Sequence, residues 1–194
     1  MTKILNHINT YADLTAYNND KEKDYPNVSY LVATDEVKWV KDDPVHIVCK
    51  YNVTSTESAT KLLETNSDIT YQIIDGVRQD TVQMNYTFDT LGEHIVEYKL
   101  DGTSIVNNAF SNCTGLTSVT IGSGVTYIGY GTFGYCTGLT SVIIQATTPP
   151  TLVNVSAFDN TNNCPIYCPA ESVDAYKAAT NWSSLASRIK PISE

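Results

Sequence analysis

Charge is scarce in this sequence, and positive charge is scarcer still. Charged residues make up 17% of the 194 residues, against about a quarter in an ordinary soluble domain. Acidic residues outnumber basic ones by 21 to 12, which gives a formal net charge of -9. A surface of this sign repels a phosphate backbone and no basic cluster offsets it, so the composition argues against nucleic-acid binding.

Long hydrophobic stretches are also missing. There is no run of 18 apolar residues, so the sequence predicts no membrane-spanning helix. The first residues, MTKILNHINTYADL, carry neither an apolar core nor a small-residue cleavage site. We therefore expect neither a secretory signal nor insertion into a membrane.

The shortage of charge is concentrated in one block. Between residues 103 and 169 the only charged side chain is Asp159, and Thr, Ser, Asn and Gly replace charged residues. A neutral, Thr-rich block of this kind typically builds short stacked strands, because β-branched side chains suit a pleated surface. The step in composition predicts a change of architecture near residue 102.

A repeat of 23 residues fills this block. Residues 103–125 and 126–148 are identical at 11 of 23 positions, and each contains CTGLTSV and the pattern L-x-x-V-x-I. The last two apolar residues of that pattern lie two apart, so they face the same side of a short strand. One coil cannot bury that side alone, so we predict stacked coils. Their interior is expected to hold Phe110, Phe133, Leu116 and Leu139.

Two clear copies are fewer than the three or so that stability requires, so we expect protected ends. Phe158 marks a degenerate third coil. In the closing segment 170–194, residues 170–180 are good helix formers with Val173, Tyr176 and Ala179 at helical spacing, and Asn181 ends the stretch. Trp182, Leu185 and Ile189 continue the apolar stripe, so we predict a short amphipathic helix over the last coil.

Residues 44–102 precede the repeats and are rich in β-branched and aromatic side chains. The segments HIVCKYNV, ITYQII, VQMNYTF and HIVEYKL are separated by turn signals such as Asp75-Gly76. We predict a small antiparallel β-sandwich, which resembles an immunoglobulin-like spacer. It runs directly into residue 103 and is expected to cap the first coil.

The repeat pattern I-x-x-x-A-F-x-x-C-x-x-L-x-x-V-x-I resembles the BspA-type leucine-rich repeats of surface proteins from gut and oral anaerobes and their phages. The first copy fits it from Ile105 to Ile121, and the second departs only in having Thr132 for Ala. The resemblance covers residues 103–192 and implies adhesion or recognition, with motif residues that are structural. The expected fold is mainly β, a short leucine-rich-repeat solenoid (103–169) after the small sandwich (44–102), closed by the cap (170–194).

Residues 1–43 form an expected arm, a short helix followed by a hairpin around Thr34-Asp35. So small a piece buries little by itself, so we expect it to pack on a partner or on another copy of the chain. The segment YPNVSYLVATDEVKWVKDD is similar to N-terminal pieces of structural proteins from phages of gut anaerobes. The expected anchoring side chains are Tyr11, Leu14, Tyr17, Tyr30 and Trp39.

No residue pattern typical of catalysis, of a cofactor site or of a metal site occurs. The three histidines lie far apart and none is at ligand spacing from a cysteine, so we expect no enzyme activity, cofactor or metal. Cys113 and Cys136 occupy equivalent positions in adjacent coils, at a spacing that would suit a disulfide. We favour free buried thiols, because no signal directs the chain to an oxidising compartment.

Two sets of side chains are candidates for recognition. Outward-facing residues of the stacked strands would form a ribbon of hydroxyls and methyls: Thr117, Thr120, Thr140 and Ile143. The other set has amphipathic rings that suit contacts with sugars or proteins: Tyr127, Tyr130 and Tyr135. The alternatives are a merely solvated ribbon, and tyrosines that pack between coils or subunits.

Two functions follow from the resemblances as expectations. The first is a non-enzymatic virion surface protein of a phage (a head fibre, capsid decoration or tail-associated protein) assembled in the host cytoplasm. Its arm would bind virion structural proteins, and its repeats would attach to a host or mucosal glycan or protein. We expect a homo-oligomer, with a trimer preferred. The alternative is a bacterial cell-surface adhesin or recognition module of a gut anaerobe, which would need the secretory signal that we do not find.

Overall fold

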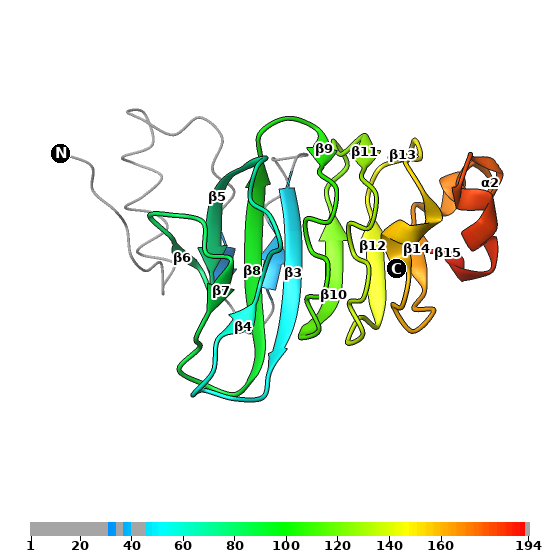
Figure 1. Cartoon of the computed structure of the whole chain (residues 1–194). Coiled ribbons are helices and arrows are strands. Elements are labelled where there is room, and N and C mark those ends of the chain that lie inside the picture. The colour runs from blue at the N-terminus through cyan, green and yellow to red at the C-terminus, as the bar shows by residue number, and fades with distance from the viewer. Residues whose placement is uncertain (1–30, 34–36, 40–45, 193–194) are drawn as a thin grey trace, which may run out of the picture.

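The computed structural model describes residues 31–33, 37–39 and 46–192. These residues are mainly β, as predicted, and their strands lie side by side along the molecule with short helical segments at the C-terminal end (Figure 1). The largest sheet has eight strands in the order β15-β14-β12-β10-β3-β8-β5-β6. A second sheet of three strands, β13-β11-β9, runs beside the repeats.

The repeat folds into coils that contribute one strand to each of these two sheets. The strands are β9 (Ser104–Ile105), β10 (Leu116–Ile121), β11 (Tyr127–Ile128), β12 (Ser141–Ile144), β13 (Thr151–Leu152), β14 (Ile166–Cys168) and β15 (Ile189–Pro191). Pairing within the repeats is parallel, and Val119 lies opposite Val142, 23 residues on. The same offset joins Ile105 to Ile128. Equivalent residues of consecutive coils therefore stack, which is what the repeat length predicts.

The strands before the repeats are antiparallel and match the segments that the sequence indicates. They are β3 (His46–Val53), β4 (Thr60–Lys61), β5 (Ile69–Ile74), β6 (Val77–Arg78), β7 (Asn85–Tyr86) and β8 (Gly92–Leu100). Strand β3 lies between β8 and β10 and pairs antiparallel with both. Cys49 of β3 is opposite Val119 of β10.

The expectation of an immunoglobulin-like sandwich is not supported by this topology. Of the strands between residues 44 and 102, β3, β8, β5 and β6 continue the sheet of the repeats, and β4 and β7 form a separate two-stranded sheet. The physical reason lies at the edge of β10, whose backbone groups would otherwise face solvent and invite pairing with another chain. Strand β3 fills that edge, so the segment caps the repeats by strand pairing.

One hydrophobic core runs from residue 47 to residue 189. Phe110, Phe133 and Leu116 are 0% exposed and Leu139 is 1% exposed, as predicted. The rings of Phe110 and Phe133 stack with centroids 5.3 Å apart, and Phe133 stacks on Phe158 of the third coil at 5.6 Å. The aromatic stack fills the space between coils and joins them.

The C-terminal segment closes this stack. The helix α2 (Val173–Ala178) is shorter than the predicted one and is flanked by the 3-10 segments η2 (Ala170–Ser172) and η3 (Trp182–Arg188). Trp182 Nε1 donates a hydrogen bond to Pro150 O at 2.7 Å, and the Tyr176 hydroxyl donates to Ala146 O at 2.8 Å. Both side chains are 0% exposed, so the apolar stripe covers the end of the core.

The predicted N-terminal hairpin is present as two paired strands, β1 (Leu31–Ala33) and β2 (Val37–Trp39). They are antiparallel, with Leu31 opposite Trp39. The predicted N-terminal helix lies outside the described residues.

Candidate functional site

The outer face of the eight-stranded sheet carries an open groove where β3 meets the repeats. Alternate residues of each strand point to this face, and Thr120 of β10 lies between Val48 of β3 and Ile143 of β12. The groove has a volume of about 640 Å³. The repeats line it with Thr117, Ser118, Thr120, Thr140, Ser141 and Ile143. Strands β3 and β8 add Val48, Lys50, Asn52 and Glu93.

The structure thus brings the four residues of the predicted ribbon together, with different roles. The Thr117 hydroxyl donates to Lys50 O at 3.1 Å, and the Thr140 hydroxyl donates to Thr117 O at 2.8 Å. These two hydroxyls therefore bind the backbone of the neighbouring strand. Thr120 and Ile143, which point into the groove further along the strands, are half-buried and remain accessible to a ligand.

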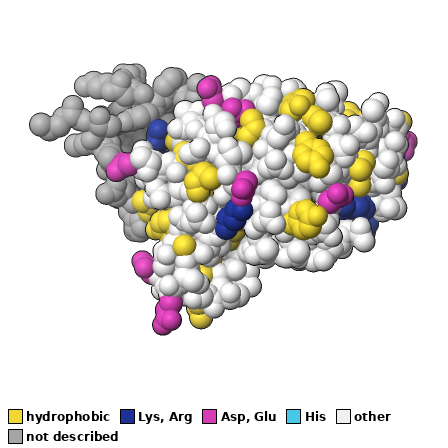
Figure 2. All heavy atoms as spheres, viewed as in Figure 1, with side chains coloured by type: hydrophobic (Ala, Val, Ile, Leu, Met, Phe, Trp, Pro, Cys, Tyr) yellow, Lys and Arg dark blue, Asp and Glu magenta, His cyan; other side chains and the backbone are white. Residues whose placement is uncertain are grey.

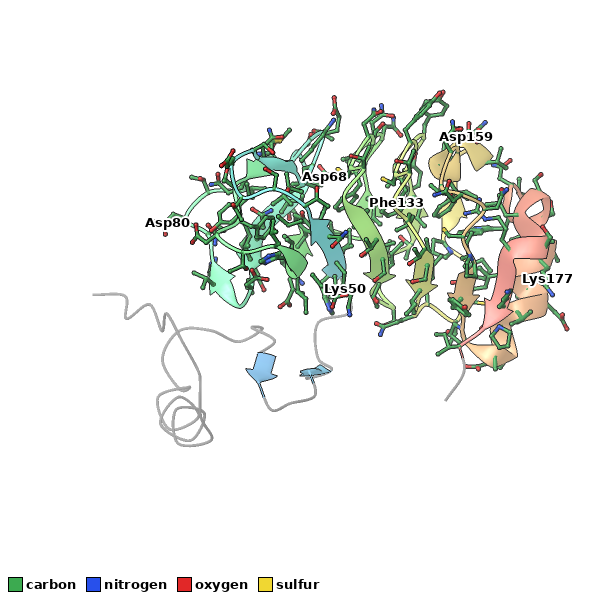
Figure 3. All side chains as sticks on the ribbon, turned by 90° about the horizontal axis from the view of Figure 1, so that it is seen from below. Lys50, Asp68, Asp80, Phe133, Asp159 and Lys177 are labelled. Atoms are coloured by element: carbon green, nitrogen blue, oxygen red, sulfur yellow. The ribbon has the colours of Figure 1, made fainter. Side chains whose placement is uncertain are left out.

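Lys50 and Glu93 form a charged wall of the groove that was not predicted from the sequence. Lys50 Nζ lies 2.9 Å from Glu93 Oε1, and the two side chains are 41% and 57% exposed. A pair this exposed adds at most about 1 kcal/mol of stability. Its main effect is to leave the groove without net charge. Lys50 projects from the outer face in Figure 3. The alternation Val48, Lys50, Asn52 indicates a shared strand face, but the pairing of β3 with β10 is not local information.

Glu97 of β8 extends the same face away from the repeats. It lies opposite Val48 on one side and Ile73 on the other. Burial among these side chains raises the pKa of the Glu97 carboxyl to about 7. At neutral pH this face therefore carries a carboxyl group that holds its proton more readily than an exposed one.

The three predicted tyrosines lie elsewhere. Tyr127, Tyr130 and Tyr135 are 36%, 52% and 55% exposed, and none of them lines the groove. Tyr135 N donates to Asp159 O at 2.8 Å, which places it beside Asp159. Figure 3 shows Asp159 and Lys50 on opposite sides of the molecule. The ribbon and Tyr135 thus belong to different surfaces, and the exposure of Tyr130 and Tyr135 argues against packing between coils.

The predicted anchoring residues cannot be placed in this arrangement. Tyr11, Leu14, Tyr17 and Tyr30 lie outside the described residues, as does the side chain of Trp39. Anchoring through these residues stays a prediction.

The five cysteines are free and buried, in agreement with the preferred alternative. Cys136 Sγ donates to Phe110 O at 3.0 Å, which is the expected contact of a thiol with the backbone of the adjacent coil. Burial raises the pKa of Cys136 to about 12 and raises that of Cys113 further, so both thiols stay protonated. In the part of the chain that the structure describes, no three His, Cys, Asp or Glu side chains gather as a metal site would require.

A hydrogen-bonded cluster around His94, near the start of β8, was not predicted from the sequence. His94 is 7% exposed, with Nδ1 2.6 Å from Asp75 Oδ2 and Nε2 3.0 Å from Thr90 O. The Thr90 hydroxyl is 3.3 Å from the same Nε2. This order of groups resembles a catalytic triad, but the ring nitrogen already faces a backbone carbonyl and the ring packs on Phe88 at 4.1 Å. We assign the cluster a structural role in holding the turn at Asp75 against β8.

Parallel strands in a 23-residue register, stacked phenylalanines and a capped end define a leucine-rich-repeat β domain. The BspA type leucine-rich repeat region matches residues 80–187 in six copies. The match spans more than half of the chain, and the protein belongs to this family. The matched region begins among the antiparallel strands that precede the repeats, in agreement with the place of β8 in the same sheet as the repeats. The family is typical of cell-surface proteins and suggests a surface adhesin or recognition module.

No curated protein matches the sequence. Among the described residues, no helix has the length and apolar character needed to cross a membrane. The comparisons give no support to a phage virion or to an immunoglobulin-like spacer.

Proposed function

We propose that this protein is a non-enzymatic recognition module of a bacterial cell-surface adhesin. In this proposal the groove on the outer face binds a glycan or protein displayed on a host or mucosal surface. The observation that carries it is the groove itself, where the hydroxyl ribbon of β10 and β12 meets Val48 and the Lys50–Glu93 pair. Membership of the BspA-type family supports the same function.

The chemistry of the groove suits weak and uncharged contacts. Hydroxyls of Ser118, Thr120 and Ser141 stand beside the methyl groups of Val48 and Ile143, and the one ion pair has no net charge. Such a surface has little charge to desolvate, and it is small compared with the 1,200 Å² or more that stable interfaces bury. We expect millimolar affinity for a single copy, equivalent to about 4 kcal/mol.

Useful attachment then requires many copies side by side. Linking weak sites raises the overall avidity by roughly 10²–10⁴ without any new contact. We propose that a homo-oligomer, with a trimer preferred, or dense display on a cell supplies this number. The arm of residues 1–43 is the proposed assembly element, and deleting it should abolish oligomer formation while leaving the repeats folded.

The virion function is not taken further. It depended on residues 1–43, whose proposed anchoring side chains lie outside the described residues, and the family comparison favours the surface adhesin.

The test places two charges in the groove. Thr120→Glu with Ile143→Lys, displayed in many copies on beads, should abolish attachment to mucin-coated surfaces or epithelial cells. A matched control carries the same new charges outside the groove, as Thr148→Glu with Gln145→Lys, two exposed positions after β12. The control should attach like the wild type. Attachment that survives the groove substitutions would overturn the proposed site.

A further inference from the structure

The face opposite the groove has an unusual backbone position. We call it the turn face; it comprises residues 106–115, 129–138 and 153–165. A left-handed residue recurs at the same place in three coils: Asn112 has φ 58°, Tyr135 has φ 62° and Asn160 has φ 55°. Asparagine enters this region readily, whereas a bulky side chain brings its Cβ close to the following carbonyl oxygen. Tyr135 therefore carries a backbone strain that the equivalent residues Asn112 and Asn160 do not.

The strained residue does not serve the core. The Tyr135 side chain is 55% exposed, and the space between coils is filled by Phe133, which is 0% exposed. Its backbone is fixed, because Tyr135 N donates to Asp159 O at 2.8 Å. Tyr130 is similarly displayed, 52% exposed with its N–H bonded to Asn107 Oδ1 at 2.8 Å. Backbone strain at a residue whose side chain is exposed is a reason to look for a role in recognition.

A second hollow of about 640 Å³ opens in the next coil after that of Tyr135. It lies where η1 (Val155–Phe158) meets η3, and Asp159, Asn160 and Asn163 form one side. Asn160 is equivalent to Tyr135 one coil further on, and Tyr135 N donates to Asp159 O, so the backbone of Tyr135 adjoins two residues that line the hollow. Figure 2 shows this side of the repeats, where single hydrophobic groups stand on a largely uncharged surface.

Arg188 lines the hollow, and its guanidinium group already makes hydrogen bonds within the protein. Arg188 Nε donates to Cys164 O at 2.9 Å, and Arg188 Nη2 donates to Thr161 Oγ1 at 2.9 Å. The guanidinium group is therefore committed to the fold. The polar groups that remain for a ligand are the Asp159 carboxylate and the amides of Asn160 and Asn163, with Ser184, Ser187 and Lys190 opposite.

We propose that this hollow binds a neutral oligosaccharide, with the Tyr135 ring packed on the C–H face of one sugar. Vicinal hydroxyls would donate to the Asp159 carboxylate and exchange hydrogen bonds with the Asn160 and Asn163 amides. Aromatic rings, amides and one carboxylate in an open hollow of this size match the needs of a polyhydroxylated, uncharged ligand. Lys190 faces the single carboxylate of Asp159 and Arg188 is committed to internal bonds, so the hollow offers an anionic chain no excess of positive charge, on a protein of net charge -9.

This inference goes beyond the proposed function, because the two sites face opposite ways. Lys50 beside the groove and Asp159 beside the hollow project from opposite faces in Figure 3. Both sites can be occupied at once, so one copy would bridge a surface partner and a polysaccharide.

The test is native electrophoresis of the full chain in gels that contain dextran, mannan or laminarin, with heparin as the anionic comparison. The wild type should be retarded by at least one neutral polymer and not by heparin. Tyr135→Asn places the residue of both neighbouring coils at this position, so the Tm should stay equal or rise. The same change should weaken retardation about tenfold through the lost ring contact.

Tyr127→Asn removes a tyrosine of β11, the middle strand of the three-stranded sheet, which does not line the hollow, and should leave retardation unchanged. The groove variant Thr120→Glu with Ile143→Lys should also bind the polymer normally, which separates this inference from the proposed function. Four results would overturn it: no retardation by any neutral polymer, wild-type binding by Tyr135→Asn, a lowered Tm of Tyr135→Asn, or loss of binding in the groove variant.

Discussion

Gly138 shows how closely two coils of the repeat approach each other. A Cβ at this position would lie 2.4 Å from Thr114 O and 3.1 Å from Leu116 O, both backbone atoms that cannot turn away. The equivalent Gly115, one coil earlier, has its nearest neighbour at 3.4 Å, the methyl group Cγ2 of Thr60. The same position of the repeat therefore has different surroundings in the two coils, because the first coil packs on β3 and β4 instead of on another coil.

This pair gives a matched prediction. Gly138→Ala should lower the free energy of unfolding by roughly 2 kcal/mol or more, because the coils must separate to admit the methyl group. Gly115→Ala should change it by about 0.5 kcal/mol or less, since its contacts are ordinary. Urea unfolding of the two variants measures the difference. Equal effects would show that the coils are not stacked as described.

Glu97 makes stability depend on pH. Burial raises its folded-state pKa from 4.5 to about 7. Between these values the unfolded chain has lost the proton and the folded chain has kept it, so rising pH favours unfolding. The loss is complete above about pH 7. Glu97→Gln should therefore stabilise the protein by roughly 1–3 kcal/mol at pH 8 and have no effect at pH 4.

Thermal or urea unfolding at the two pH values measures this effect. Glu93→Gln on the same strand is a control, because Glu93 is exposed and paired with Lys50. A Glu97→Gln variant with the same gain at both pH values would show that the carboxyl is not the titrating group.

At the scale of the elements, the stacked rings hold the coils together. Phe133 lies between Phe110 and Phe158, at centroid distances of 5.3 Å and 5.6 Å. Removing its ring leaves a cavity that two neighbouring coils share. Phe133→Ala should cost about 3–5 kcal/mol, whereas Tyr130→Ala, an exposed aromatic of the same coil, should cost about 0.5 kcal/mol. An unchanged melting curve for Phe133→Ala would refute the register of the coils.

The elements also show what the sequence can and cannot predict. The 23-residue period predicts the buried phenylalanines Phe110 and Phe133 and the stacking of equivalent residues, because both follow from local spacing. Phe158 lies 25 residues after Phe133 and marks the third coil through its aromatic position, outside the strict period. The pairing of β3 with β10 could not be predicted, because two segments about 70 residues apart meet there and their alternation fits any exposed strand edge equally well. The helix was predicted too long, because Ala179 is extended and Asn181 adopts φ 66°.

The candidate site divides in the same way. The outward positions Thr120 and Ile143 follow from the strand pattern, but their neighbours Val48 and Lys50 depend on the unpredicted pairing. The tyrosines were predicted as binding residues from their side-chain type alone. Only the structure shows that Tyr135 lies on a different surface from the ribbon of Thr120 and Ile143.

At the scale of the whole molecule, the eight-stranded sheet presents the groove on its outer face, and the hollow lies on the opposite side of the molecule, where η1 meets η3. The groove is the basis of the proposed attachment, and Lys50 is the lysine that lines it. Lys177 on α2 is exposed at the C-terminal end, far from the groove (Figure 3). In one experiment, Lys50 therefore reports on contact at the groove and Lys177 reports on general accessibility of the surface.

Acetylation of lysines in the free and the surface-attached protein, read by mass spectrometry, tests the central claim most directly. If the groove is the contact surface, attachment to a mucin-coated surface should reduce the labelling of Lys50 severalfold and leave that of Lys177 unchanged. Full labelling of Lys50 in the attached protein would contradict the account.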